Sequence, residues 1–412
     1  MLFNTEKIIT VFRDIKLALK RGTINLPLHG GQAPSYLIKR MIKLSSAISK
    51  IIIEENGSKE FFNRISDPLW FQAFGCVLGF DWHSSGLTTV VTGVLKQSLT
   101  SQQHGITISG GKGKNSTKPK YEIYKLAEKN YNLSTNKINK LLYASKMSAK
   151  IDNSAIQDGF SLYHHMIFFD GYGNWTIIQQ GLNEKYKIAR RYHWISDNLI
   201  NFIIEPHKGI IGNERIPLCL NMTSREAEEN RKSCVDLVKE GSNSIKSSIY
   251  KIVETNTFEN LDKWIPMNRS SSDSNSFVEQ MRTYIEKYDM PRKINWKTMD
   301  ALYDISPTNY EHLISQNGVG PSTIRALALI SEIIYGNRAS WSDPVKYNYA
   351  HGGKDGVPYP IARKTYDNSI KYLSEAINGS EIEKLEKISS LKRLSIYSNI
   401  IFNTNDYDYH GK

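Results

Sequence analysis

Histidine occurs in this chain in short segments that also hold carboxylate, glycine or aromatic side chains. FDWHSSG (80–86), YHH (163–165) and EPH (205–207) are three of these segments. Imidazole and carboxylate groups carry general acid–base chemistry, carboxylates also bind Mg²⁺ or Mn²⁺, and glycine lets the backbone approach a ligand closely. We therefore expect a catalytic site, with the candidate catalytic residues Asp81, His83, Asp158, His164, His165, Glu205 and Asp343.

Three interpretations of these residues are open. In the first, Asp81, Asp158 and Glu205 hold Mg²⁺ or Mn²⁺ for the cleavage of a phosphodiester. In the second, histidine acts as general acid and base without a metal, and GGKGK (110–114) forms an anion-binding nest. In the third, the polar groups only satisfy loops and contact a partner. The sequence contains no metal-ligand spacing as diagnostic as H-E-x-x-H, so it does not decide among the three.

Two glycine-rich segments add lysines to these candidates. SGGKGKNSTKPK (109–120) has no apolar residue, which predicts either a solvated loop or a flexible clamp for phosphate built on Lys112 and Lys114. AHGGKDG (350–356) combines histidine, lysine and glycine, so His351 and Lys354 are further candidates for contact with DNA.

The segment QNGVGPSTIRAL (316–327) places two glycines and a proline between two stretches with apolar residues at helical spacing. Glycine allows backbone angles that are closed to other residues, and proline fits best in the first turn of a helix. The segment resembles the helix-hairpin-helix element of DNA glycosylases, repair nucleases, ligases and polymerases. The resemblance implies sequence-independent DNA binding through unpaired N–H groups, whereas an ordinary helical corner closed by glycines is the alternative. The residues implied are Gly318, Val319, Gly320, Ser322, Thr323 and Arg325.

Two further positions bear on a glycosylase activity. In bifunctional glycosylases with this element, a lysine lies in the second helix of the hairpin, and here Ser322 stands at that place. The Schiff-base chemistry of a lyase is therefore not supported there. Asp343 stands near the position of the catalytic aspartate of such enzymes, although Asp343-Pro344 is also the pattern of a helix N-cap followed by proline.

Composition indicates the kind of partner and the compartment. The 412 residues carry a net charge of +12, which favours a polyanion because each cation that neutralises a phosphate releases a counterion. A general bias toward lysine would give the same surplus without such a partner. Cys76, Cys219 and Cys234 are scattered, which predicts a cytoplasmic protein without disulfides or a zinc ribbon. No apolar run has the length of a membrane span, so we expect no membrane association.

The elements that position these residues indicate an α+β fold. Runs rich in isoleucine, phenylalanine and aromatic residues flank DGYGN (170–174) and predict a β-hairpin that could place His164 and Gln179 on one sheet face. NRSSSDSNSF (268–277) has the composition of a linker. We expect a mixed α/β domain of catalytic type at 1–267, a linker at 268–276, and an all-α helix-hairpin-helix domain with a C-terminal extension at 277–412.

Nearly the whole chain is similar to a family of archaeal and bacterial proteins known only as a domain of unknown function. The matching stretches include LPLHGGQAP, GFDWHSSGLTT, YHHMIFFDGYGNW, GVGPSTIRALAL and DPVKYNYAHGGKDGVPYP. The resemblance implies no activity, so function depends on the hairpin and the polar clusters. We expect a DNA-binding repair enzyme, in the first place a structure- or damage-directed nuclease. The alternatives are a monofunctional base-excision glycosylase that uses Asp343 and a non-catalytic DNA-binding scaffold.

Overall fold

A six-stranded sheet lies at the centre of the computed structural model, which describes residues 35–80, 86–117, 119–212, 215–255, 287–345, 347–348 and 363–405. The strand order is β1-β3-β4-β5-β6-β8, and all neighbours are antiparallel except β6 and β8, which are parallel. The strands are β1 (Ile106–Lys112), β3 (Ser161–Asp170), β4 (Trp175–Asn183), β5 (Ile188–Ile195), β6 (Gly209–Gly212) and β8 (Tyr347–Asn348).

The predicted β-hairpin around DGYGN is confirmed as the pair β3–β4. Its turn is closed by Asp170, whose Oδ1 accepts hydrogen bonds from the N–H groups of Tyr172 (2.9 Å) and Asn174 (3.0 Å). Aspartate favours turns because its side chain can bond the backbone two residues on. The signal is local, which is why the sequence predicted this element correctly.

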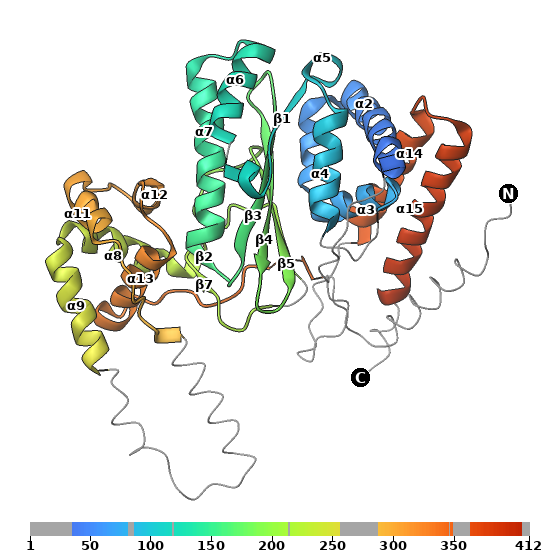
Figure 1. Ribbon diagram of the computed structural model, residues 1–412. Helices are drawn as coiled ribbons and strands as arrows, with labels where there is room; N and C mark the ends of the chain where they lie inside the picture. Colours follow the sequence, from blue (N-terminus) through green and yellow to red (C-terminus); the bar gives the residue numbers. More distant parts are fainter. Residues whose placement is uncertain are drawn as a thin grey trace, which may run out of the picture.

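Both faces of the sheet are buried, and each face belongs to a different hydrophobic core. Met166, Phe168 and Ile178 pack on one face, whereas Ile167 and Ile177 pack on the other. Successive side chains of a strand point to opposite faces, so neighbouring residues divide between the two cores. The result is a sheet between two layers of helices (Figure 1).

The first layer combines the beginning and the end of the described chain. Helices from the last part of the sequence pack against α2 and α3, although more than 280 residues separate them along the chain (Figure 1). The members of this layer are α2 (Ser35–Ser66), α3 (Pro68–Val77), α4 (Gly86–Ser98), α14 (Arg363–Gly379) and α15 (Lys384–Asn405), with the short α5 (Ser101–His104) leading into the sheet.

On the other face of the sheet, α6 and α7 cover the strands, and a helical unit lies beyond them (Figure 1). Within this unit α13 packs against α8 and α9, and α11 and α12 also contact α8. The elements here are η1 (Gly113–Thr117), α6 (Pro119–Tyr131), α7 (Thr135–Lys150), η3 (Arg225–Ala227), α8 (Glu228–Lys239), α9 (Ser242–Thr255), α11 (Trp296–Ile305), α12 (Tyr310–Ser315) and α13 (Pro321–Tyr335).

The helical unit is built from both sides of the predicted linker. Helices α8 and α9 precede residues 268–276, and α11 to α13 follow them, yet their side chains share one core. The helices α14 and α15, which the sequence analysis assigned to the same domain as α13, pack instead on the opposite side of the sheet. The linker itself lies outside the described residues.

A short ladder joins the sheet to the helical unit. Helix α7 passes directly into a π-helical turn, η2 (Ile151–Ala155), and the next residues pair as β2 (Ile156–Gln157) with β7 (Leu220–Asn221). π-Helical turns are rare and occur frequently at functional sites. This junction positions most of the polar residues described below.

The structure confirms the α+β class and corrects a local assignment. Residues 86–98, which begin at the glycine of the segment FDWHSSG, form helix α4. The glycines of GGKGK were expected in a loop, but Gly110 and Gly111 belong to β1. Among the residues described, no helix is both long and apolar enough to cross a membrane.

Candidate functional site

A buried arginine on β5 holds two carboxylates from distant parts of the chain. Arg190 is fully buried and donates from Nη1 to Asp158 Oδ2 (2.9 Å). It also makes a bidentate contact with Asp343, from Nη1 to Oδ1 (3.0 Å) and from Nη2 to Oδ2 (2.7 Å). Burial by itself lowers the pKa of Arg190, but Asp158 and Asp343 outweigh it and raise that pKa above its ordinary value. The sequence analysis selected both carboxylates and missed the arginine that joins them.

Hydrogen bonds within the chain occupy the acceptor positions of the Asp343 carboxylate. Besides the two contacts from Arg190, it accepts the N–H of Ile216 at Oδ2 (2.6 Å) and the N–H of Val345 at Oδ1 (3.0 Å). An ionised carboxylate has about four acceptor positions, so these four donors leave none for a water molecule. Asp343 therefore anchors the loops around Arg190 and is unsuited to activate water. No helix begins at Pro344 within residues 341–345, so the N-cap interpretation is wrong as well.

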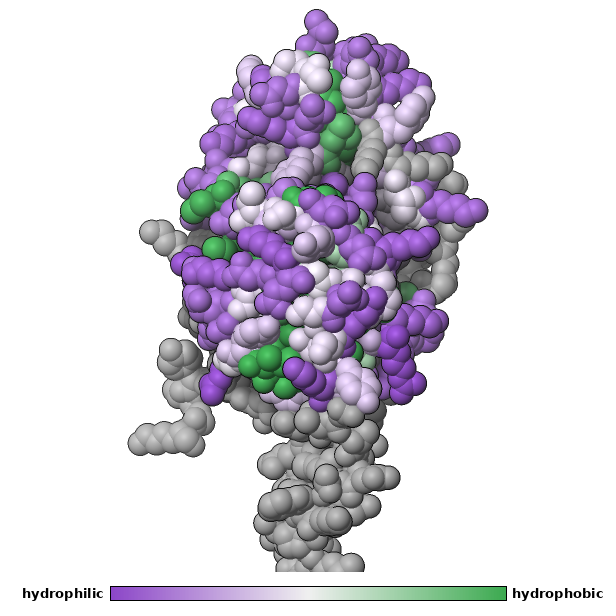
Figure 2. All heavy atoms as spheres, turned by 90° about the vertical axis from the view of Figure 1, so that its left-hand side faces the viewer, coloured by the Kyte–Doolittle hydropathy of each residue, from purple (hydrophilic) through white to green (hydrophobic). Residues whose placement is uncertain are grey.

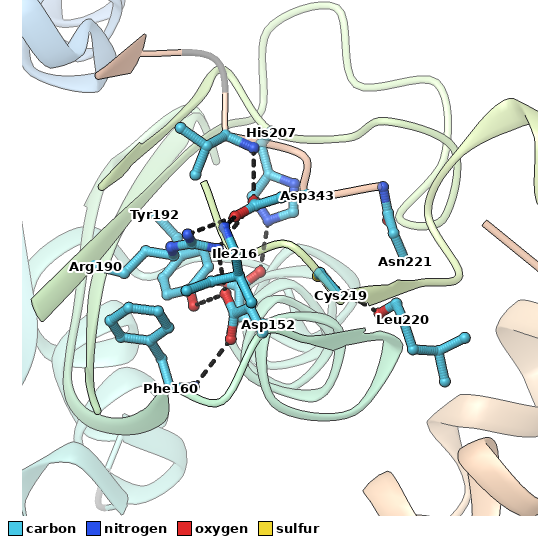
Figure 3. Close-up of polar contacts among 12 residues, drawn as sticks. Asp152, Phe160, Arg190, Tyr192, His207, Ile216, Cys219, Leu220, Asn221 and Asp343 are labelled. Atoms are coloured by element: carbon cyan, nitrogen blue, oxygen red, sulfur yellow. Dashed lines mark hydrogen bonds and ion pairs between the residues drawn. The ribbon is translucent and has the colours of Figure 1, made fainter. Parts of the chain in front are cut away.

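A second buried carboxylate, Asp152, lies in the π-helical turn η2. Its Oδ2 accepts hydrogen bonds from Gln179 Nε2 (2.5 Å) and Trp194 Nε1 (2.9 Å), and its Oδ1 contacts His207 Nε2 (2.5 Å). Burial raises the pKa of Asp152, while the three donors oppose that shift. Figure 3 shows Asp152, His207, Tyr192 and Arg190 gathered close together, with Asp343 beside them.

His207 connects this buried network to a small pocket. The ring of His207 lies 4.2 Å from that of Trp194, between centroids, and only 6% of the residue is exposed. The pocket has a volume of about 200 Å³. Its lining includes Glu205, His207, Asn221, Thr223, Glu226 and Asp343.

The two adjacent histidines of β3 point to opposite faces of the sheet. His165 lies on the face of Asp152, where it contacts Ser145 Oγ (2.9 Å) and Gln179 Oε1 (2.8 Å). His164 lies on the other face and contacts Thr92 Oγ1 (2.9 Å). The expectation that His164 and Gln179 share a face is wrong, because the strand register pairs His165 with Gln179.

Burial keeps both of these histidines neutral. It lowers the pKa of His165 to about 4, with the hydrogen bond to Gln179 opposing the shift. Burial also lowers the pKa of His164 to about 3, and the nearby charges of His165 and Lys112 add to the effect. Both side chains lie inside the fold, where a substrate does not reach them without displacing core residues.

The three predicted metal ligands are not brought together by the described residues. Asp158 is buried against Arg190 and Tyr192, whereas Glu205 is exposed and pairs with Arg225 at 3.3 Å. Asp81 lies outside the described residues. No group of three or more His, Cys, Asp or Glu side chains suited to a metal ion occurs within the part of the chain that the structure describes.

The predicted hairpin connects α12 to α13, and hydrogen bonds from a lysine side chain hold its backbone. Lys150, at the end of α7, donates to the carbonyl oxygens of Gln316 and Val319, both at 2.6 Å. Burial, and then the charge of Lys146, lower the pKa of Lys150 to about 8, so its ammonium form prevails at neutral pH. Gln157 of β2 adds a hydrogen bond to the carbonyl of Pro321 (2.9 Å).

The two hairpin glycines have different structural roles. Gly318 has a φ of +83°, and a Cβ atom placed on it would lie 2.2 Å from Thr298 Oγ1. Gly320 has an extended backbone, with φ of −137°, and a Cβ atom there would meet nothing within 4 Å. Gly318 is therefore required by the fold, while Gly320 leaves open space in front of the helix.

The other predicted site residues have different surroundings, and Ser322 is half-buried in the first turn of α13. Arg325 donates to the carbonyls of Asp289 and Lys287, at 3.1 and 3.0 Å, and Thr323 is buried, so both serve the fold. Lys112 and Lys114 are exposed. Four predicted residues lie outside the described part of the chain and receive no structural account, namely Asp81, His83, His351 and Lys354.

Fold and site together define an α+β protein in which a buried polar network lies next to a helical unit. The chain matches the model of a family described as protein of unknown function (DUF763) over residues 22–361, and it belongs to that family. No curated protein and no solved structure shows significant similarity to it.

Proposed function

We propose that the protein binds duplex DNA without sequence preference through the hairpin of residues 316–323. The observation that carries the proposal is the pair of hydrogen bonds from Lys150 to the carbonyls of Gln316 and Val319. In a trans peptide unit the C=O and the following N–H point in opposite directions. Holding the two carbonyls inward therefore directs the N–H groups of Asn317 and Gly320 outward, where a phosphate oxygen can accept them.

The surroundings of the hairpin support a phosphate as its ligand. Asn317 and Gly318 are exposed, and Gly320 stands at the N-terminus of the fifteen-residue helix α13, whose dipole favours an anion there. Hydrophilic residues dominate the face that the helical unit presents, and hydrophobic residues appear on it only as separate small groups (Figure 2). A net charge of +12 favours a polyanion over a protein partner.

In the same proposal the bound DNA is hydrolysed as part of repair. The sequence favours a nuclease, for which Asp81, Asp158 and Glu205 were the expected ligands of Mg²⁺ or Mn²⁺. The structure pairs Asp158 with Arg190 and Tyr192, and Glu205 with Arg225, so it gives this form of the proposal no support from Asp158 and Glu205. Base excision gains support from the pocket beside His207, because carboxylates line it and a cationic transition state is favoured there over a phosphate. In that form of the proposal His207 takes the role that the sequence analysis gave to Asp343.

The proposal is tested with labelled duplexes that are intact, nicked, flapped, abasic or deaminated, incubated with and without Mg²⁺ or Mn²⁺. Strand cuts that need the metal support the nuclease, and breaks that appear only after alkali support base excision. Binding to all duplexes without any reaction supports the scaffold. A protein that binds none of them at low salt contradicts the proposal as a whole.

A further inference from the structure

His207 lines the pocket and is paired, behind the pocket wall, with a buried carboxylate. Asp152, fully buried, holds Nε2 of His207, and the same carboxylate is fixed by Gln179 and Trp194. An ionised aspartate that accepts from one ring nitrogen fixes the tautomer and leaves a lone pair on the other nitrogen. His207 thus presents Nδ1 as a proton acceptor.

Nδ1 of His207 has no hydrogen-bond partner among the residues that the structure describes. The ring lines the pocket, so a ligand there lies beside it, although the residue is 94% buried. A histidine that is fixed on one side and open on the other is suited to general acid–base catalysis.

The mouth of the pocket is acidic. Glu205 and Glu226 are exposed side chains of its lining, whereas the charge of Asp343 is compensated by Arg190. Glu205 has a cationic partner in Arg225 at 3.3 Å, but that contact is largely exposed and weak. Carboxylates in this position stabilise a centre that becomes positive during a reaction.

The size of the pocket limits what it can hold. At about 200 Å³ it is smaller than the 300–1,000 Å³ that is typical of sites for drug-sized ligands, so it suits a single ring system. Its polar groups include Asn221 and Thr223, whose side chains are hydrogen-bonded to each other at 2.6 Å. A nucleobase turned out of the duplex has the size and the polar edge for such a pocket.

The pocket and the DNA-binding hairpin are attached to the same short ladder. Gln157 of β2 donates to the carbonyl of Pro321, at the start of α13. The paired strand β7 ends at Asn221, which lines the pocket. DNA held at the hairpin is therefore held next to the element that forms the pocket wall.

We propose that this pocket hydrolyses the N-glycosidic bond of a nucleotide turned out of DNA, with His207 as the catalytic acid–base residue. This rests on the proposed function, since the hairpin must first hold the duplex. Nδ1 of His207 takes a proton from a water molecule, whose oxygen forms a bond to C1′ while the C1′–N bond breaks. The electron pair of that bond stays on the base, which receives the proton from His207. The products are a free base and an abasic sugar.

Three carboxylates support this step. Glu205 and Glu226 stabilise the positive charge that develops on the sugar, as carboxylates do in glycoside hydrolysis. Asp152 is a positioning residue, because it acts through His207 and does not touch the substrate. Its charge also stabilises the imidazolium that forms when His207 takes the proton.

The test measures release of the base under single-turnover conditions from duplexes that each contain one uracil, hypoxanthine or 8-oxoguanine, together with the duplex Kd. We expect wild-type protein to release at least one of these bases. His207→Gln and Asp152→Asn should slow release on the order of 10²–10⁴-fold and leave the Kd within about twofold. His312→Gln, which lies outside the pocket, serves as the matched control.

Two further variants separate catalysis from folding. Ser342 is exposed at the pocket, so Ser342→Trp should block entry without disturbing the core. Added imidazole should restore part of the rate of His207→Gly, but not that of Ser342→Trp. A merely structural histidine would show no such rescue.

The results distinguish this inference from the proposed function. Tight DNA binding by the wild-type protein with no base released from any of the three duplexes overturns the inference and leaves DNA binding intact. A full rate in His207→Gln or in Ser342→Trp also overturns it. If the protein binds no DNA, hydrolysis of free deoxynucleosides at millimolar concentration still tests the pocket, and its absence there overturns the inference as well.

Discussion

Substitution of Gly318 by alanine tests whether the hairpin is held in the conformation described here. The positive φ of Gly318 costs an L-residue about 1–2 kcal/mol. The new methyl group would also lie 2.2 Å from Thr298 Oγ1, so the buried Thr298 side chain must move, which costs a further 1–3 kcal/mol or so. We therefore expect Gly318→Ala to lower the free energy of unfolding by roughly 2–5 kcal/mol.

The assay is urea unfolding followed by circular dichroism, with two companion variants. Gly320→Ala has an extended backbone and open space around the new methyl, so its free energy of unfolding should stay the same or rise by up to about 1 kcal/mol. Thr298→Ala removes the atom nearest to the clash, so Gly318→Ala should cost less in that background, by about the steric part. Equal losses in Gly318→Ala and Gly320→Ala would refute the assignment of different roles to the two glycines.

Three further variants test the buried network and the support of the hairpin. Arg190→Met leaves Asp158 and Asp343 without their cation and should lower the free energy of unfolding by about 3–5 kcal/mol in thermal or urea melts, so a loss under about 1 kcal/mol contradicts the ion-pair account. His165 stays neutral in the fold down to its pKa of about 4, while the unfolded chain binds a proton below about pH 6.5. The free energy of unfolding should therefore fall by up to about 3 kcal/mol as the pH drops from 6.5 to 4. Urea midpoints should show a smaller dependence on pH in His165→Gln, and an unchanged dependence contradicts the assignment of a neutral, buried His165. Lys150→Met should weaken duplex binding in a fluorescence-anisotropy titration because the hairpin carbonyls lose their donor, and an unchanged Kd would show that the hairpin does not depend on it.

Elements with local signals were predictable from the sequence. Asp67-Pro68 has the residue pattern of a helix start, and Asp67 Oδ1 accepts the N–H groups of Leu69 and Trp70, at 2.8 and 3.0 Å. The turn at Asp170 fixed the β3–β4 hairpin in the same way. The pairing of His164 with Gln179 was expected one residue out of register, because the ladder runs regularly from the pair of Phe169 and Trp175 at the turn and places His165 opposite Gln179.

The candidate site was predictable only in part, because its contacts join distant residues. Arg190 meets Asp158 across 32 residues and Asp343 across 153, and no spacing rule links them. Asp152 depends on a π-helical turn, for which the sequence has no signature. The segment EPH contains His207, but the sequence analysis selected Glu205 from it as a candidate. The structure was needed to show that His207 lines the pocket.

The central claim, that the hairpin offers its N–H groups to DNA phosphates, is tested most directly by duplex binding, measured across salt concentrations, in wild-type protein and Gly320→Val. The valine stands in open space and in an allowed backbone conformation, so the fold should persist. It should block the approach of a phosphate and lower the affinity roughly 10–100-fold. The slope of log K against log[salt] should stay close to that of the wild type, because an uncharged N–H neutralises no phosphate and releases no counterion. A folded Gly320→Val variant with wild-type affinity would contradict the account.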